Sequence, residues 1–143
     1  MDPEETARLS TEQMWRDDAA SRMLGMEVVE VGPGRATVSM TVREDMINGW
    51  DVCHGGLVAS LADSAFAVAC NSHGTVTVAA GFDVTFVASA KLGDHLVASA
   101  VERSRRGRSG LYDVTVRRSG DGEVVAEFRG RSHATRRTSP ALD

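Results

Sequence analysis

Apolar and polar residues alternate along six segments of the chain, and this period of two is typical of strands with one buried face. The pattern is clearest in residues 36–42, where every second residue from Ala36 to Val42 is apolar and the others are serine or threonine. An Asp-Gly pair at residues 121–122 predicts a hairpin turn before the last strand. The predicted strands are residues 26–31, 36–42, 75–88, 95–103, 110–118 and 123–133.

One segment between the second and third strands is apolar without alternation. Residues 56–71 are rich in alanine and contain no proline, which favours a helix about 24 Å long. Its apolar residues cover nearly the whole circumference, so we expect a helix that is buried on all sides. Asp63 interrupts this apolar run, and Gly74 lies just past it, where a left-handed residue often ends a helix.

The two ends of the chain are polar. We expect residues 1–9 to be frayed, and a short helix to follow over about residues 10–24 with Ser10 or Thr11 as its cap. The tail over about residues 134–143 is expected to be loose.

The predicted order of elements is two strands, the long helix and then four strands. Long consecutive strands favour an antiparallel sheet, and one helix against such a sheet makes an α+β protein. A sheet wrapped around the helix accounts for the helix's burial. Because the edges of a sheet usually need a partner, we expect at least a dimer.

Composition narrows the function without identifying it. The chain has 143 residues, of which 42% are hydrophobic and 25% charged, so we expect one globular domain over residues 1–143. The net charge of −4 does not favour binding to nucleic acid. The apolar run before Asp63 is too short to cross a membrane, and the first residues are acidic where a signal peptide would be basic, so we expect a cytoplasmic protein with no membrane partner. Cys53 and Cys70 lie at opposite ends of the helix, too far apart to form a disulfide.

The central segment also resembles a known family. It contains His-Gly-Gly at residues 54–56, Asp63 within Leu-Ala-Asp-Ser-Ala-Phe-Ala, and Asn-Ser at residues 71–72. This combination resembles the hotdog-fold acyl-CoA thioesterases of the phenylacetate-degradation (PaaI) type. Residues 128–133 are similar as well, and the resemblance covers about residues 14–133.

The resemblance implies a hotdog fold, in which an antiparallel sheet wraps around one long central helix. It implies a homodimer with a continuous sheet and an active site at the subunit interface, with two dimers often paired into a homotetramer. The implied substrate is an acyl-CoA thioester of the aryl or hydroxyphenylacetyl type, and no cofactor is implied.

Hydrolysis of a thioester needs a group that stabilises the carbonyl oxygen as it becomes negative, and an oxygen nucleophile. The thiolate itself leaves readily near neutral pH. The free N–H groups and the dipole at the start of the helix supply the first requirement. Gly55, helped by Gly56, is the expected donor, and one such donor is worth ~3 kcal/mol. The structural alternative is that the two glycines only form a tight turn into the helix.

Asp63 lies seven residues after Gly56, two helical turns further on and on the same face. It is the expected catalytic carboxylate, either as a general base for water or as a nucleophile that forms an anhydride. The structural alternative is a buried acid that is hydrogen-bonded to the backbone.

Three residues of the preceding loop complete the candidate site. By resemblance, Asn48 orients the carbonyl or the attacking water, and His54 orients the loop or the thioester. Their alternatives are an ordinary Asn-Gly turn and a structural histidine. Trp50 either lines an aromatic acyl pocket or has only a structural role, packing against neighbouring residues.

Arginine accounts for nearly all the basic residues, and Lys91 is the only lysine. The planar guanidinium suits phosphate, which CoA carries at its nucleotide end. The candidate contacts are Arg106 and Arg108 at one turn and Arg131 on the last strand, with a solvated charged turn as the alternative.

Other chemistries have weaker support. The cysteines and histidines are too few for a metal site, and nothing marks Cys53 as an activated thiol. A hotdog dehydratase or hydratase would need a histidine paired with a carboxylate across the site. A non-catalytic acyl-CoA sensor would use the same cleft, and the intact Asp63 argues against it.

Overall fold

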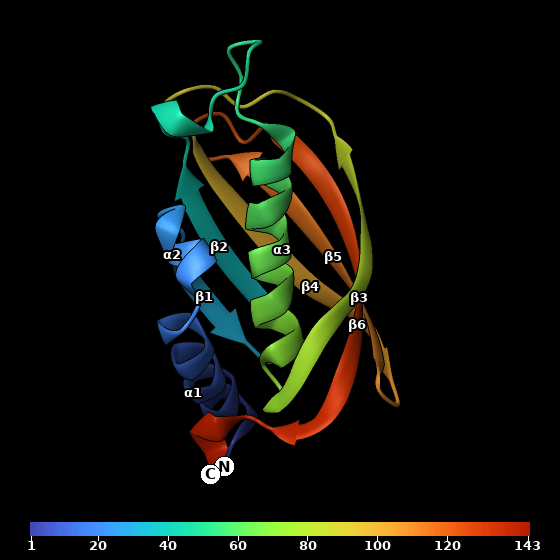
Figure 1. The fold of residues 1–143 in the computed structure, drawn as a ribbon. Coiled ribbons are helices and arrows are strands. Elements are labelled where there is room, and N and C mark those ends of the chain that lie inside the picture. Colours follow the sequence, from blue (N-terminus) through green and yellow to red (C-terminus); the bar gives the residue numbers. More distant parts are fainter.

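Six strands form one sheet that curves around helix α3 in the computed structural model, which describes residues 1–143 (Figure 1). Their order in the sheet is β1-β2-β4-β5-β6-β3, and every neighbouring pair is antiparallel. The predicted α+β architecture, one sheet wrapped around one long helix, is therefore confirmed. The strands are β1 (Glu27–Gly32), β2 (Arg35–Thr41), β3 (Thr75–Phe86), β4 (His95–Arg106), β5 (Ser109–Arg118) and β6 (Val124–Thr138).

The N-terminal segment forms two helices, α1 (Pro3–Arg16) and α2 (Ala19–Met23), rather than a frayed start and a single helix over residues 10–24. Helix α1 begins early because the Asp2 side chain accepts a hydrogen bond from the third helical N–H at 2.9 Å, and a proline occupies the first helical position. Asp18 caps α2 in the same way. Both corrections come from aspartate caps that the apolar pattern does not reveal.

The C-terminal tail is ordered, which corrects the expectation of a loose segment over residues 134–143. Strand β6 continues to Thr138, which pairs with Thr75 at the start of β3. A 3-10 turn, η2 (Pro140–Leu142), follows and packs on α1, so that the two termini lie side by side (Figure 1). Strand pairing holds the tail up to Thr138, and contact with α1 holds η2.

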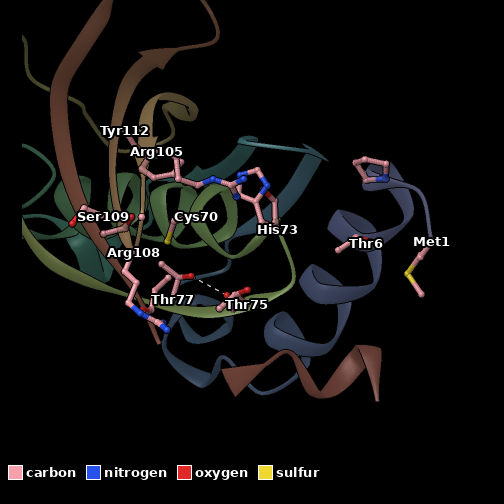
Figure 2. A pocket seen from close by; sticks show the side chains of 15 residues that line it. Met1, Thr6, Cys70, His73, Thr75, Thr77, Arg105, Arg108, Ser109 and Tyr112 are labelled. Carbon is pink, nitrogen blue, oxygen red and sulfur yellow. Dashed lines mark hydrogen bonds between the residues drawn. The ribbon is translucent and has the colours of Figure 1, made fainter. Parts of the chain in front are cut away.

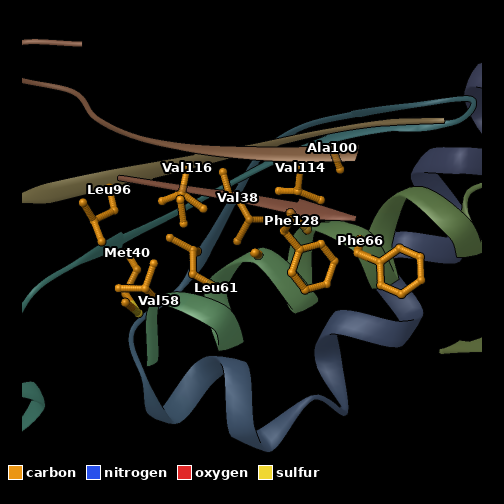
Figure 3. Close-up of a cluster of buried hydrophobic side chains, with 14 of the residues drawn as sticks. Val38, Met40, Val58, Leu61, Phe66, Leu96, Ala100, Val114, Val116 and Phe128 are labelled. Atoms are coloured by element: carbon orange, nitrogen blue, oxygen red, sulfur yellow. The ribbon is translucent and has the colours of Figure 1, made fainter. Parts of the chain in front are cut away.

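Helix α3 (Gly55–Asn71) begins one residue before the predicted range. Its apolar side chains point into the concave face of the sheet (Figure 3). The Phe66 ring lies 5.5 Å from Tyr112 and 5.8 Å from Phe128, measured between ring centroids. Each large apolar side chain buried in this way contributes about 1.5–3 kcal/mol. Gly74 then adopts a φ of +86°, as its position after the helix predicts.

The prediction that α3 is buried on all sides is wrong for the single chain. The sheet covers one side of the helix, and α1 and α2 contact only part of the rest. The face that carries Asp63 is therefore only half covered. The half-buried residues on it are Ala59, Ser60, Asp63, Ser64 and Ala67.

The sheet has two edges, formed by β1 and β3. Strand β3 exposes large apolar side chains, with Val78 and Phe86 each 50% exposed and Phe82 41% exposed. Phe82 still stacks on Phe128, with the ring centroids 4.6 Å apart. An apolar strand with one unpaired edge is a surface that proteins usually cover. None of the helices is long and apolar enough to cross a membrane.

Candidate active site

The start of α3 presents unpaired backbone donors. His54 is the N-cap, and Gly55 and Gly56 are the first two helical residues. The N–H groups of both glycines have no acceptor within the chain, as is usual for the first N–H groups of a helix. Gly56 borders a hollow of about 260 Å³, which Leu57 and residues 45–47 also line. Two donors and the positive end of the helix dipole therefore lie at or beside a small open cavity.

Gly55 and Gly56 differ in what surrounds them. A Cβ atom at Gly55 would lie 3.0 Å from Cζ of Phe86, the last residue of β3. A Cβ atom at Gly56 would meet only Nδ1 of His54, at 3.9 Å. Glycine at position 55 therefore permits the close approach of Phe86, and at position 56 it leaves space for a ligand. Phe86 was not predicted as part of the site, because no signal in the sequence relates the end of this strand to the start of the helix.

The loop before α3 uses one half of the Asn48 side chain. Its Oδ1 accepts the backbone N–H groups of Trp50, at 2.9 Å, and Val52, at 3.3 Å. Because both partners are donors, they fix the orientation of the amide. The Nδ2 group has no partner within the chain. Asn48 thus shapes the turn through its oxygen and keeps an amide donor available.

His54 and Trp50 are both exposed. The His54 backbone N–H donates to the carbonyl of Met46 at 2.8 Å, whereas its imidazole makes no hydrogen bond within the chain. Trp50 lies in the loop between η1 (Glu44–Met46) and α3 and is 87% exposed. Packing within its own chain therefore does not explain this tryptophan.

Asp63 is half-buried on the uncovered side of α3, and its carboxylate has no hydrogen-bond partner within the chain. Burial raises its pKa, and the negative charge of Asp18 on α2 raises it further. The alternative of an acid satisfied by backbone hydrogen bonds is therefore not what the structure contains. An unpaired, partly buried carboxylate with a raised pKa is typical of a functional site.

Helix α2 is held against this part of α3 by a chain of hydrogen bonds. The Ser21 hydroxyl lies 2.7 Å from Oδ2 of Asp18 and 2.7 Å from the hydroxyl of Ser64, the residue after Asp63. Asp18 was not predicted as a neighbour of the Asp63 carboxylate. Its capping position is visible in the sequence, but its position beside α3 is not.

The three candidate phosphate-binding arginines do not lie at the helix start within one chain. Arg106 and Arg108 are in and beside the β4–β5 turn, next to the C-terminal end of α3. The helix is about 25 Å long, and this length separates them from Gly55. Arg131 forms an exposed ion pair with Asp83 at 2.9 Å.

Other reactive groups are placed away from the helix start or are inactive. Both cysteines are free and buried, and burial raises the pKa of Cys53 and, together with the charge of Asp63, that of Cys70 to about 12. No three ligating side chains are grouped as a metal site would require. The histidine–carboxylate pair, His73 and Glu102 at 2.8 Å, lies at the far end of α3, away from Gly55 and Gly56.

Comparisons with known proteins agree with this geometry. A family profile described as Thioesterase superfamily matches residues 51–125. Acyl-coenzyme A thioesterase PaaI of Escherichia coli strain K12 is 41% identical over 120 residues, which are 84% of this chain and 85% of that protein. Acyl-coenzyme A thioesterase 13 of Homo sapiens is 30% identical over 115 residues, 78% of this chain and 82% of the human protein.

A solved structure matches over nearly the whole chain. The E. coli PaaI protein from the phenylacetic acid degradation operon aligns with a TM-score of 0.93 and 37% identity, covering 96% of this chain and 99% of that one. The agreement therefore includes the fold, the central motif and most of the length of both chains. The chain belongs to the thioesterase superfamily, and within it to the PaaI-type acyl-CoA thioesterases with the hotdog fold.

Proposed function

We propose that this thioesterase hydrolyses acyl-CoA thioesters with an aromatic acyl group, of the aryl or hydroxyphenylacetyl type, to the free acid and CoA. The pair of unpartnered N–H groups at the start of α3 carries the proposal of hydrolysis. The half-exposed Phe86 ring beside Gly55, and the exposed Trp50 in the loop that leads into the helix, support an aromatic acyl group. The phenylacetic acid degradation operon of the E. coli relative supports the same choice.

In the proposed mechanism, the thioester oxygen accepts hydrogen bonds from the N–H groups of Gly55 and Gly56. These bonds strengthen as the oxygen becomes negative. Water adds to the carbonyl carbon while its proton passes to the Asp63 carboxylate, and the C–S bond then breaks to release the CoA thiolate. Alternatively, Asp63 attacks directly and forms an anhydride that water opens. The free amide group of Asn48 and the imidazole of His54 orient the reactants.

The active site requires two subunits on this proposal. Gly55 and Asp63 are eight residues apart on one helix, which is a rise of about 12 Å and more than an aspartate side chain can span. The carboxylate at the carbonyl is therefore Asp63 of the partner subunit. The exposed apolar edge of β3 supports a homodimer whose sheets continue across the interface. We also propose that two such dimers form a homotetramer, and that the protein is cytoplasmic.

Release of free thiol from a panel of acyl-CoA esters tests the activity and the acyl preference together. The panel contains phenylacetyl, hydroxybenzoyl, short aliphatic and medium aliphatic esters. We expect the aromatic esters to give the highest kcat/KM, and Asp63→Ala to lower kcat by about 100-fold or more with an unchanged fold. A near-native rate in Asp63→Ala would remove Asp63 from the mechanism. Tight binding of the esters without any release would instead indicate a sensor.

Mixed oligomers test the location of the site. One subunit carries Asp63→Ala and the other carries Gly55→Pro, which removes the donor N–H at a helical position where proline is tolerated. Each variant alone is expected to be inactive. A mixed dimer has one site with both groups intact, so random mixing should restore about a quarter of the wild-type rate per subunit. Failure to restore any activity would place both groups in one chain.

We propose that arginine side chains bind the phosphates at the nucleotide end of CoA. The proposed contacts are Arg106, Arg108 and Arg131, each from the subunit whose copy lies beside the ligand. Substitution of each by glutamine should raise KM for an acyl-CoA, and it should not change KM for the matching acyl-pantetheine, which has no nucleotide. Equal effects on both substrates would contradict a phosphate contact.

A further inference from the structure

A cavity of about 510 Å³ lies at the end of α3 opposite Gly55 (Figure 2). Its walls are the last turn of α3, the start of β3, the β4–β5 turn, β6 and the first residues of α1. Its volume is in the range of sites for small organic ligands. Only 4 of its 15 lining residues are hydrophobic, so its occupant must be polar.

Two residues of the cavity wall, His73 and Tyr112, are held in place by the carboxylate of Glu102, which does not itself line the cavity. Oε1 of Glu102 accepts a hydrogen bond from the hydroxyl of Tyr112 at 2.7 Å and lies 2.8 Å from Nε2 of His73. Burial alone would raise the pKa of Glu102, but the hydrogen bonds from Tyr112 and His73 lower it. The carboxylate is therefore charged at neutral pH, and both of its neighbours within the cavity wall are bound to it. The Glu102 carboxylate therefore has its hydrogen-bond partners within the chain.

Ser132 supplies an unused donor in the same cavity. The residue is only 5% exposed, yet its hydroxyl forms no hydrogen bond within the chain. A Cβ atom at Gly110, across from it, would collide with this hydroxyl and with the Tyr112 ring. The glycine thus keeps the space around the hydroxyl open. The Ser132 oxygen is open to the cavity rather than enclosed, so the hydroxyl is available to donate to an occupant.

Two guanidinium groups border the cavity. Arg108 is anchored through Nη1 to the carbonyls of Ala134, at 3.3 Å, and Thr135, at 2.8 Å, which leaves its other N–H groups free. Arg105 makes no ion pair or hydrogen bond, although its charge lowers the pKa of Glu102 slightly as one of several causes. Figure 2 shows Arg105 directed toward His73, and Arg108 on another side of the cavity. The cavity therefore offers a ligand two separate guanidinium groups, those of Arg105 and Arg108.

We propose that this cavity binds an organic phosphate that carries at least two anionic groups, with Arg105 and Arg108 holding the charges and Ser132 donating from the wall. Guanidinium groups bind phosphate oxygens by charge-assisted, bidentate hydrogen bonds. A single inorganic phosphate is too small to fill a cavity of about 510 Å³. Two sources fit this chemistry: a free nucleotide, and the nucleotide end of a CoA substrate bound across the subunit boundary. The second source rests on the proposed function.

Calorimetric titration of the Asp63→Ala protein tests the site without turnover. The probes are ADP, 3′-phospho-ADP and inorganic phosphate, with citrate as a carboxylate of similar charge. We expect both nucleotides to bind more tightly than inorganic phosphate or citrate, and their affinity to fall as salt is added. Arg105→Gln, which breaks no contact within the chain, should weaken nucleotide binding by about 10-fold. Adding Arg108→Gln should weaken it further.

Arg117→Gln is the matched control, because Arg117 also donates through Nη1 to one backbone carbonyl but lies outside this cavity. Its nucleotide affinity should equal that of the parent protein. The proposal is overturned if neither nucleotide binds at millimolar concentration, or if binding persists unchanged in the Arg105→Gln and Arg108→Gln double variant.

Steady-state kinetics of Arg105→Gln in the otherwise native protein identify the source. A higher KM for an acyl-CoA, with no change for the acyl-pantetheine, assigns the site to the substrate. No change for either substrate, together with weaker nucleotide binding, assigns it to a free nucleotide. If the native protein hydrolyses no ester at all, the proposed function fails while the titration result still decides whether this cavity binds nucleotides.

Discussion

Replacement of Gly55 by proline and by alanine tests the oxyanion donor directly. Gly55 is the first residue of α3, a position where the fixed φ of proline suits the helix. His54 before it has a φ of −56° and a ψ of 129°, which a residue preceding proline adopts readily. Both substitutions add a Cβ atom 3.0 Å from Cζ of Phe86, so they share a steric cost. Only proline removes the N–H group.

The ratio of the two rates therefore measures the loss of the donor together with the ring carbon that replaces its hydrogen. An oxyanion donor contributes about 2.7–4 kcal/mol, so kcat of Gly55→Pro should be about 100- to 1,000-fold below that of Gly55→Ala. Phe86 is half-exposed, and Phe86→Ala removes the shared collision. The ratio should persist in that background, while the rate of Gly55→Ala recovers. The assay is thiol release at saturating acyl-CoA, with circular dichroism to verify the fold. If proline and alanine differ by less than about 3-fold in both backgrounds, the Gly55 N–H is not the donor.

Three further substitutions test the electrostatics and the stability of the fold. Asp18→Asn removes a like charge and so lowers the pKa of Asp63, which should move the acidic limb of the kcat/KM profile to lower pH; an unchanged limb would contradict this coupling. Asp63→Asn should raise Tm at neutral pH, because a carboxyl whose pKa rises on folding contributes stability below its unfolded pKa and loses it as the pH rises through the folded pKa. That gain should disappear below about pH 3, where the carboxyl is protonated in both states, and a gain that persists there would have another cause. Tyr112→Phe removes the hydrogen bond to Glu102 and should cost about 1.5–3 kcal/mol in urea unfolding, whereas equal stability would show that the bond is not needed.

The fold was predictable where one local period governs a whole segment. The apolar run predicted α3 to within one residue, and the alternation predicted all six strands. The prediction errors lie at the two ends of the chain, where a few polar contacts determine where an element begins or ends. One cap at Asp2 starts α1, and the last part of β6 is held by pairing with β3, which begins at Thr75. Neither contact changes the apolar pattern, so the pattern contains no signal for it.

The candidate site was predictable in its residues and not in its geometry. The central motif identifies Gly55, Gly56 and Asp63, and the spacing of seven residues places Gly56 and Asp63 on one helical face. A shared face is not contact, because seven residues of helix separate Gly56 from Asp63 by about 10 Å. The approach of Phe86 to Gly55 and of Asp18 to Asp63 depends on how distant segments pack. Such proximities follow from the sheet order and from the position of α2, which the sequence analysis did not resolve.

The uncovered face of α3 connects the remaining observations. Its residues Ala59 and Ala67 flank Asp63 and are too apolar to favour permanent contact with water, and the adjacent edge of β3 exposes apolar side chains. The predicted burial of α3 on all sides would therefore be met only in the proposed dimer, with a second subunit on this face. A partner on this face would remove further water from Asp63 and raise its pKa above the value set by its own chain. Assembly would then both supply the second half of the active site and tune its base, so dissociation should abolish turnover and lower the pKa of Asp63 in the same step.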